Sequence, residues 1–90
     1  MYEIDFEPKV KKTMAKWKKS NPMLFRKLTK ILESIMDNPR FGIGHPEPLV
    51  GGNDITWSRH ITRNDRIIYD INDRKIEVMV LELEGHYSDK

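Results

Sequence analysis

The stretch "DITWSRHITRNDRIIYDINDRKIEVMVLEL", residues 54–83, decides the fold. Apolar and polar side chains alternate along three runs of it, at about 54–62, 66–71 and 75–83, and a period of two residues is typical of half-buried strands. The joints "RND" and "NDR" carry the Asn and Asp that tight turns prefer. The stretch therefore predicts a meander of three antiparallel strands.

The residues before this meander predict one more strand and two helices. Alternation at 2–6 indicates a strand, and apolar residues at helical spacing over 8–20 indicate a helix with a proline in its first turn. Asn21 has the place of an N-cap and Pro22 that of the first position of a second helix, which ends near 38–39. This order predicts one α+β domain over the whole chain, with both helices on one face of a mainly antiparallel sheet.

Composition limits the class of protein. Ninety residues are enough for one domain, and a chain with 38% hydrophobic and 33% charged residues is typical of a folded globular protein. No apolar run has the length of a membrane span, and a chain without cysteine has no disulfides or thiol nucleophiles. The amino terminus lacks the pattern of a secretory signal, so we expect a cytoplasmic protein that does not contact a membrane.

Charge is distributed unevenly along the chain. Residues 8–30 hold nine Lys or Arg and no Asp or Glu, whereas from residue 31 onward acids outnumber bases by eleven to seven. A surface with one sign of charge attracts polyanions. The two predicted helices therefore form either a solvated basic face or, as the complete absence of acids favours, a nucleic-acid surface.

One face of the predicted meander gathers polar side chains. By alternation His60 and Arg66 share this face, and the short turn between their strands brings them together. Arg59 falls on the opposite face, near its rim. Glu47 is held between two prolines in the loop over 39–53 and can reach the start of the polar face. Because both helices cover the other side, we expect the polar face to be an open, shallow surface.

If Glu47 and Arg66 converge with His86 and Tyr87, they make a metal-free acid/base site. Glutamate and histidine can move protons, while arginine and tyrosine can hold a phosphate or developing negative charge. Plainer explanations stay open, namely a surface glutamate in a proline-rich loop and a frayed His-Tyr tail. The three histidines and the scattered acids show no metal-ligand spacing, so we expect no metal and no other cofactor.

With these motifs in hand, the chain resembles the Txe/YoeB toxins of the RelE/ParE group. The resemblance rests on "GIGHPEPL" (42–49), "WSRHIT" (57–62), "DRIIY" (65–69) and "HY" (86–87), in the family's order and spacing. It implies a RelE-like fold and a ribosome-dependent messenger-RNA endoribonuclease, the toxin of a type II toxin–antitoxin system. Family toxins are neutralised by a cognate antitoxin and cleave RNA without a metal, by attack of the ribose 2′-hydroxyl on the adjacent phosphate.

The resemblance also implies roles for four residues of this chain. The glutamate of "PEPL" is Glu47, which would be the general base. Arg66 would stabilise charge on the phosphorane. His86 would assist protonation of the leaving group, and Tyr87 would hold the phosphate. The implied partners are the antitoxin, the ribosome and messenger RNA, and a homodimer stays open.

Three features depart from the family pattern. The family usually has "WSRRI" where this chain has "WSRHI", so His60 replaces an arginine and can bind phosphate only when protonated. We still expect His60 and Arg59 to bind substrate. Val50 stands where the family tends to have a lysine, and residues 88–90 follow the terminal tyrosine. Two alternatives therefore stay open: a non-catalytic gyrase inhibitor like the ParE toxins, and a degenerate toxin that only binds its antitoxin.

Overall fold

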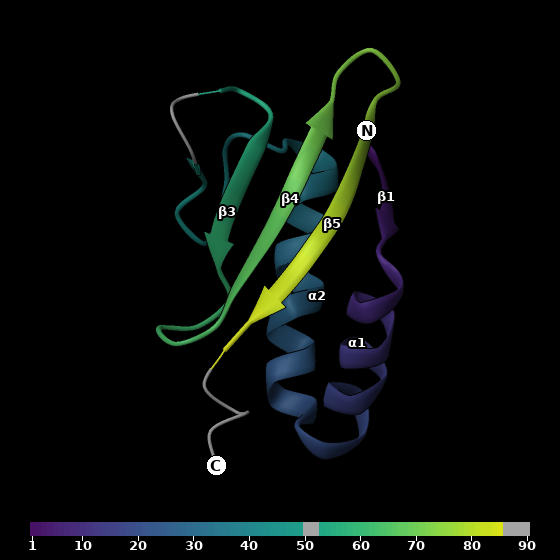
Figure 1. Cartoon of the computed structure of the whole chain (residues 1–90). Helices are drawn as coiled ribbons and strands as arrows, with labels where there is room; N and C mark the ends of the chain where they lie inside the picture. Colours follow the sequence, from purple (N-terminus) through teal and green to yellow (C-terminus); the bar gives the residue numbers. More distant parts are fainter. Residues whose placement is uncertain (50–52, 86–90) are drawn as a thin grey trace.

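The computed structural model describes residues 1–49 and 53–85 as two layers, a pair of helices and a sheet. In Figure 1 the helices lie side by side behind the sheet, and the other face of the sheet points toward the viewer. The predicted α+β architecture, with both helices on one sheet face, is confirmed. The elements in chain order are β1 (Glu3–Phe6), α1 (Pro8–Ser20), α2 (Pro22–Asp37), β2 (Glu47–Pro48), β3 (Thr56–His60), β4 (Arg66–Asn72) and β5 (Glu77–Glu84).

The sheet has five strands in the order β1-β5-β4-β3-β2. β1 runs parallel to β5, and every other neighbouring pair is antiparallel, so the sheet is mainly antiparallel as predicted. β2 is an addition, because the sequence predicted only an irregular loop there. It is two residues long and ends in Pro48, and proline is tolerated on an edge strand because no partner is needed for its missing N–H. Such a short strand leaves no alternation to detect.

Both helices begin and end where the sequence predicts. A proline occupies the first turn of each helix, where its missing N–H costs no hydrogen bond. The side chain of Asn21 caps α2 by accepting a hydrogen bond from the backbone N–H of Leu24 at 3.3 Å. Lys18 and Lys19 stand in the last turn of α1, where they interact favourably with the negative end of the helix dipole.

The core lies between the helices and the sheet. Its members come from the predicted apolar stripes of both helices and from the inward positions of β4 and β5. Side chains with 0–2% of their surface exposed include Val10, Trp17, Leu28, Ile35, Ile67, Tyr69, Val78 and Val80. The stripes on the helices are therefore core, and the helical faces that remain for binding are the charged ones.

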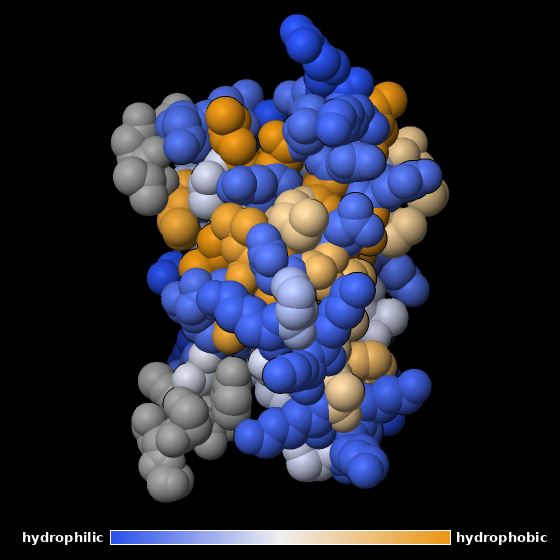
Figure 2. Space-filling model, turned by 45° about the vertical axis from the view of Figure 1, so that its right-hand side comes forward, coloured by the Kyte–Doolittle hydropathy of each residue, from blue (hydrophilic) through white to orange (hydrophobic). Residues whose placement is uncertain are grey.

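On the face shown in Figure 2, hydrophilic side chains surround hydrophobic side chains that gather toward the middle. All nine Lys and Arg side chains of residues 8–30 are exposed, so α1 and α2 present a basic layer on the side away from the sheet. Among the described residues, no helix is both long enough and apolar enough to span a bilayer.

Candidate active site

Strand register brings the polar side chains of the open face into rows. His60 of β3 pairs with Arg66 of β4, and Arg66 pairs with Glu84 of β5. In the next row Glu47 of β2 pairs with Ser58 of β3. Directly paired residues share a face, so Glu47 is a diagonal neighbour of His60. Residues in diagonal positions on neighbouring strands are typically roughly 7–8 Å apart. The predicted proximity of His60 and Arg66 is confirmed, and so is the reach of Glu47 to this face.

Arg66 is held by an ion pair that the sequence did not predict. Its Nε donates a hydrogen bond to Oε1 of Glu84 at 2.8 Å, and both side chains are about 40% exposed, at 41% and 39%. From the sequence, Glu47 is the carboxylate expected beside Arg66. An irregularity in the pairing of β4 with β5, between Ile68 and Tyr69, changes the register. Counting back from the turn therefore does not place Glu84 opposite Arg66.

The face is also less open than alternation implies. Ser58 is 3% exposed and Ile68 is 7% exposed, although both lie on the side away from the helices. These two side chains interrupt the polar face beside the row of His60 and Arg66 and the edge formed by β2.

Arg59 is buried in the interior, with 0% of its surface exposed, and not at the rim. The prediction that it binds substrate is therefore wrong, because RNA has no access to its guanidinium. That group instead donates five hydrogen bonds of 2.6–3.2 Å, two to hydroxyl oxygens and three to backbone carbonyls. The acceptors are Tyr69 Oη, Ser34 Oγ and the carbonyls of Asn38, Phe41 and Ile43.

Backbone dipoles compensate the charge of Arg59. No carboxylate within residues 1–49 and 53–85 forms an ion pair with it. One of its acceptors is the carbonyl of Asn38, the C-cap of α2, where aligned peptide dipoles place partial negative charge. A buried cation costs much free energy unless it is hydrogen-bonded, and five acceptors meet that need.

The same contacts hold the loop that leads to Glu47. Besides the bonds from Arg59, the carbonyl of Pro39 accepts from the phenol of Tyr69 at 2.8 Å, and that of Gly44 accepts from the backbone N–H of His60 at 2.7 Å. Burial raises the pKa of Tyr69 and keeps this phenol a donor. Gly44 has φ +84°, and a Cβ there would lie 2.6 Å from the carbonyl oxygen of His60. The loop therefore needs glycine at this position to lie against β3 and deliver Glu47 to the open face.

His45 borders the same site, although no sequence pattern points to it. Its ring lies edge-to-face with that of His60, with centroids 6.5 Å apart and an interplanar angle of 81°. Both histidines are exposed. The backbone of His45 has φ +54°, in the left-handed region that residues other than glycine seldom adopt. Only the tertiary structure could have revealed this pair, because its members are 15 positions apart in the sequence.

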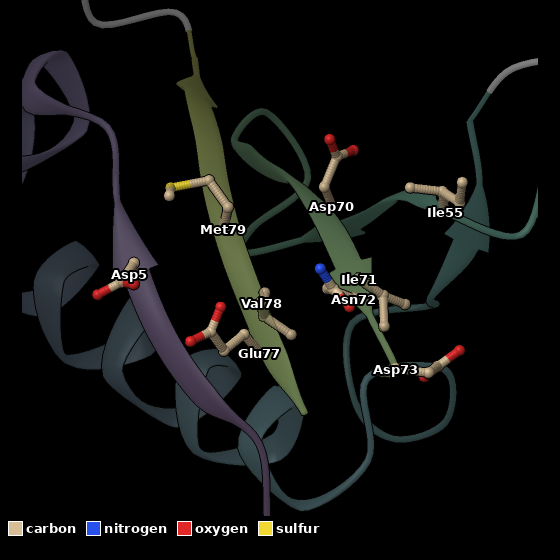
Figure 3. A pocket seen from close by; sticks show the side chains of 9 residues that line it. All are labelled: Asp5, Ile55, Asp70, Ile71, Asn72, Asp73, Glu77, Val78 and Met79. Carbon is tan, nitrogen blue, oxygen red and sulfur yellow. The ribbon is translucent and has the colours of Figure 1, made fainter. Parts of the chain in front are cut away.

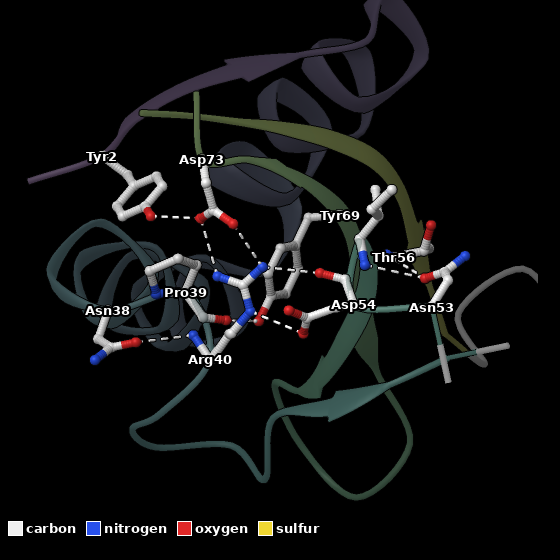
Figure 4. A network of polar contacts seen from close by, with 10 residues as sticks. Tyr2, Asn38, Pro39, Arg40, Asn53, Asp54, Thr56, Tyr69 and Asp73 are labelled. Atoms are coloured by element: carbon white, nitrogen blue, oxygen red, sulfur yellow. Dashed lines mark hydrogen bonds and ion pairs between the residues drawn. The ribbon is translucent and has the colours of Figure 1, made fainter. Parts of the chain in front are cut away.

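A second arginine fixes the other end of the loop (Figure 4). Arg40 forms ion pairs of 3.0 Å with Asp54 and with Asp73, and Asp73 also accepts a 2.6 Å hydrogen bond from the phenol of Tyr2. Arg40 and Tyr2 together hold the pKa of Asp73 below its usual value, and the bond to Asp73 raises the pKa of Tyr2. The network ties the chain start, the loop and the β4–β5 turn together, at the end of the sheet away from His60.

That end of the open face also carries a hollow of about 590 Å³ with an acidic lining (Figure 3). Its four carboxylates come from Asp5, Asp70, Asp73 and Glu77. Negative charge there repels phosphate, so an anionic substrate is favoured at the opposite end, near Arg66. Among the described residues no group of three or more His, Asp or Glu side chains is placed to hold a metal ion. His86 and Tyr87, like Val50 and residues 88–90, lie outside the described residues.

Comparison with known proteins decides the family. The model of the YoeB-like toxin of bacterial type II toxin–antitoxin systems matches residues 6–87. The chain belongs to the YoeB toxin family. Toxin YoeB of Mycobacterium bovis is 32% identical over 87 residues, which cover 97% of this chain and 100% of that one. Toxin RelK of Mycobacterium tuberculosis matches with the same identity and coverage.

Solved structures agree with this assignment. The YoeB–YefM complex of Staphylococcus aureus has a TM-score of 0.80 at 26% identity, covering 97% of this chain and 99% of the matched chain. A YoeB/ParE toxin from Agrobacterium tumefaciens has the same fold, with a TM-score of 0.83 at 24% identity and coverage of 94% and 99%. The protein is therefore a YoeB-like toxin of a type II toxin–antitoxin system, with the RelE-like fold expected from its motifs.

Proposed function

We propose that this YoeB-like toxin is a messenger-RNA endoribonuclease that cleaves its substrate on the ribosome, without a metal. The observation that carries the proposal is the position of Glu47. Its loop is bonded to β3, and it shares the open face with the row of His60 and Arg66. A carboxylate next to cationic or titratable donors is what RNA cleavage by acid/base catalysis requires.

In this mechanism Glu47 takes the proton of the ribose 2′-hydroxyl while the 2′-oxygen attacks the adjacent phosphorus. The bond from phosphorus to the 5′-oxygen then breaks, giving a 2′,3′-cyclic phosphate and a 5′-hydroxyl. Arg66 stabilises the extra negative charge on the phosphorane, and His60 assists when protonated. We assign protonation of the leaving oxygen to His86 and contact with the phosphate to Tyr87.

The contacts of Arg66 are compatible with its proposed role. Its hydrogen bond to Glu84 uses Nε, and neither Nη group is bonded to a described residue. Both Nη groups therefore stay available for phosphate oxygens, and a guanidinium binds two such oxygens at once. Glu84 fixes the side chain without occupying the donors that a phosphate would use.

We assign different partners to the helical layer and to the sheet. The exposed Lys and Arg of α1 and α2 would bind ribosomal RNA, while the open sheet face receives the message. We place the protein in the cytoplasm, where both are found. A cognate antitoxin would dock an acidic segment on the cationic part of the open face. The solved complexes of YoeB with YefM and the YoeB dimer of Staphylococcus aureus support an antitoxin partner and a homodimer for this chain.

Primer extension on a translated message, with purified ribosomes, tests the proposal. The native protein should cut at ribosome-positioned codons, and Glu47→Gln should slow cutting by a factor of about 10²–10⁴, the usual contribution of a general base. Glu3→Gln is a matched control, since Glu3 is an exposed glutamate on β1, at the opposite edge of the sheet from the β2 strand that carries Glu47. No cutting by the folded native protein would support a toxin that only binds its antitoxin. Inhibition of gyrase supercoiling would support a ParE-like binder.

A further inference from the structure

We propose that His45 and His60 together form a phosphate-binding subsite beside Glu47, which holds the RNA backbone when the imidazoles are protonated. This inference deepens the proposed function and rests on it for the identity of the ligand. The pair stands on two observations, the edge-to-face contact of the rings at 6.5 Å and the exposure of both side chains. Two exposed imidazoles at this separation can each donate to one of two successive phosphates.

The backbone around His45 supports a built site. The residue is held in the left-handed region, at φ +54°, and a hydrogen bond of 2.7 Å joins its neighbour Gly44 to the backbone of His60. Unfavourable conformations of this kind persist where the surrounding structure imposes them, and they cluster at functional sites. The bond between Gly44 and His60 places the two histidines side by side.

The charges around the pair are compatible with cationic imidazoles. From β2 the pair meets Glu47, from β4 Arg66 and from β5 Glu84, which is bonded to Arg66. The turn after His60 adds Arg63, as well as Asp65, whose carboxylate is bonded to the hydroxyl of Thr62. The charged neighbours of the pair therefore include carboxylates as well as arginines, so two charged imidazoles are not surrounded by cations alone.

The chemistry makes the subsite dependent on pH. Histidine is the side chain that ordinarily changes its charge between pH 5 and pH 8, and only the charged imidazole adds an electrostatic attraction for phosphate. The subsite therefore strengthens RNA binding in mildly acidic solution, unlike a pair of lysine or arginine side chains.

The test is the salt dependence of binding to a fluorescent 2′-O-methyl oligonucleotide, which lacks the attacking hydroxyl. Anisotropy is measured from 50 to 200 mM salt at pH 5.5 and pH 7.5, with His86→Gln as the background. The chain has three histidines, so this background leaves only the pair. Each phosphate contact with a single strand adds about 0.7 to the slope of log K against log salt. The slope should be steeper by about 1.4 at pH 5.5 than at pH 7.5.

Variants of His45 and His60 show how much each histidine contributes to this difference in slope. His45→Gln and His60→Gln should each remove about half of it, and the double variant should remove all of it while thermal unfolding shows a folded protein. His45→Lys with His60→Arg should give the steep slope at both pH values. A pH-dependent slope that survives in the double variant, or native protein that does not bind at pH 5.5, would overturn the subsite. The primer-extension assay is independent of this binding assay. If the protein cuts the message but its salt slope does not depend on pH, only the histidine subsite is refuted. If the slope depends on pH but the message is not cut, only the proposed nuclease activity is refuted.

Discussion

Replacing Arg59 by methionine tests whether this buried guanidinium holds the loop that carries Glu47. Methionine fills a similar volume but removes all five hydrogen bonds. Two of the acceptors keep another bond, because the hydroxyl of Tyr69 still donates to Pro39 and that of Ser34 still accepts from the backbone N–H of Ile43 at 3.4 Å. The remaining three acceptors are backbone carbonyls, each of which loses its donor.

Three carbonyls without their donor, at about 1 kcal/mol each, predict a loss of about 3 kcal/mol in the free energy of unfolding. A domain of this length has a total of roughly 5–13 kcal/mol, so the effect is large. Urea unfolding followed by circular dichroism measures it, with an unchanged m-value as the sign that only stability has altered. Arg66→Met is the matched control, since its half-exposed ion pair contributes no more than about 1 kcal/mol. If Arg59→Met and Arg66→Met lose equal stability, Arg59 does not hold the loop.

Three further predictions concern single contacts. Glu84→Gln should change the unfolding free energy by less than about 1 kcal/mol, because the ion pair that it breaks with Arg66 is half exposed. The same change removes a negative charge and should therefore tighten oligonucleotide binding at low salt. Unaltered binding would mean that RNA does not pass Arg66. Gly44→Ala should lower the melting temperature and slow cleavage, because its Cβ meets a carbonyl in a strained conformation; native stability and activity would show that the loop can move. Asp73→Asn should bring the pKa of Tyr2 back toward its ordinary value, since the hydrogen bond to Asp73 is the main cause of the raised pKa. A phenolate absorbance titration measures this change, and an unchanged titration would show that Asp73 is not the cause.

The last network also predicts how stability depends on pH. The pKa of Asp73 is lowered in the folded state. Asp73 therefore contributes to stability at pH values above the ordinary aspartate pKa, and this contribution is lost as pH falls through the lowered pKa of the folded state. The pKa of Tyr2 is raised, so its contribution is present below about pH 10 and is lost as pH rises through the higher value. The Arg40 network therefore weakens at both extremes and is intact near neutral pH.

Much of the fold follows from patterns that extend over several residues. Period-two alternation and the turn residues predicted β3, β4 and β5, and the proline and asparagine at the helix starts predicted α1 and α2. The meeting of His60 and Arg66 also followed, because one short turn joins their strands and no irregularity intervenes in that pair. β2 was missed because two residues show no period.

The rest of the site depends on contacts that leave no signal in the sequence. The burial of Arg59 could not be predicted, because its acceptors are mainly backbone carbonyls, which any residue type supplies. Glu84 was missed because the irregularity after Ile68 changes the count along β5. His45 was missed because its contact with His60 follows from the path of the loop.

The chemistry of the cut is the most direct test of the proposed nuclease. A message with one 2′-deoxynucleotide at the position that native protein cuts on the ribosome is compared with its all-ribose counterpart. The proposal predicts a cut in the all-ribose message that leaves a 2′,3′-cyclic phosphate and a 5′-hydroxyl, abolished by the single deoxy substitution and strongly slowed in Glu47→Gln. A cut that persists at the deoxy position, or that Glu47→Gln makes at the native rate, would contradict it.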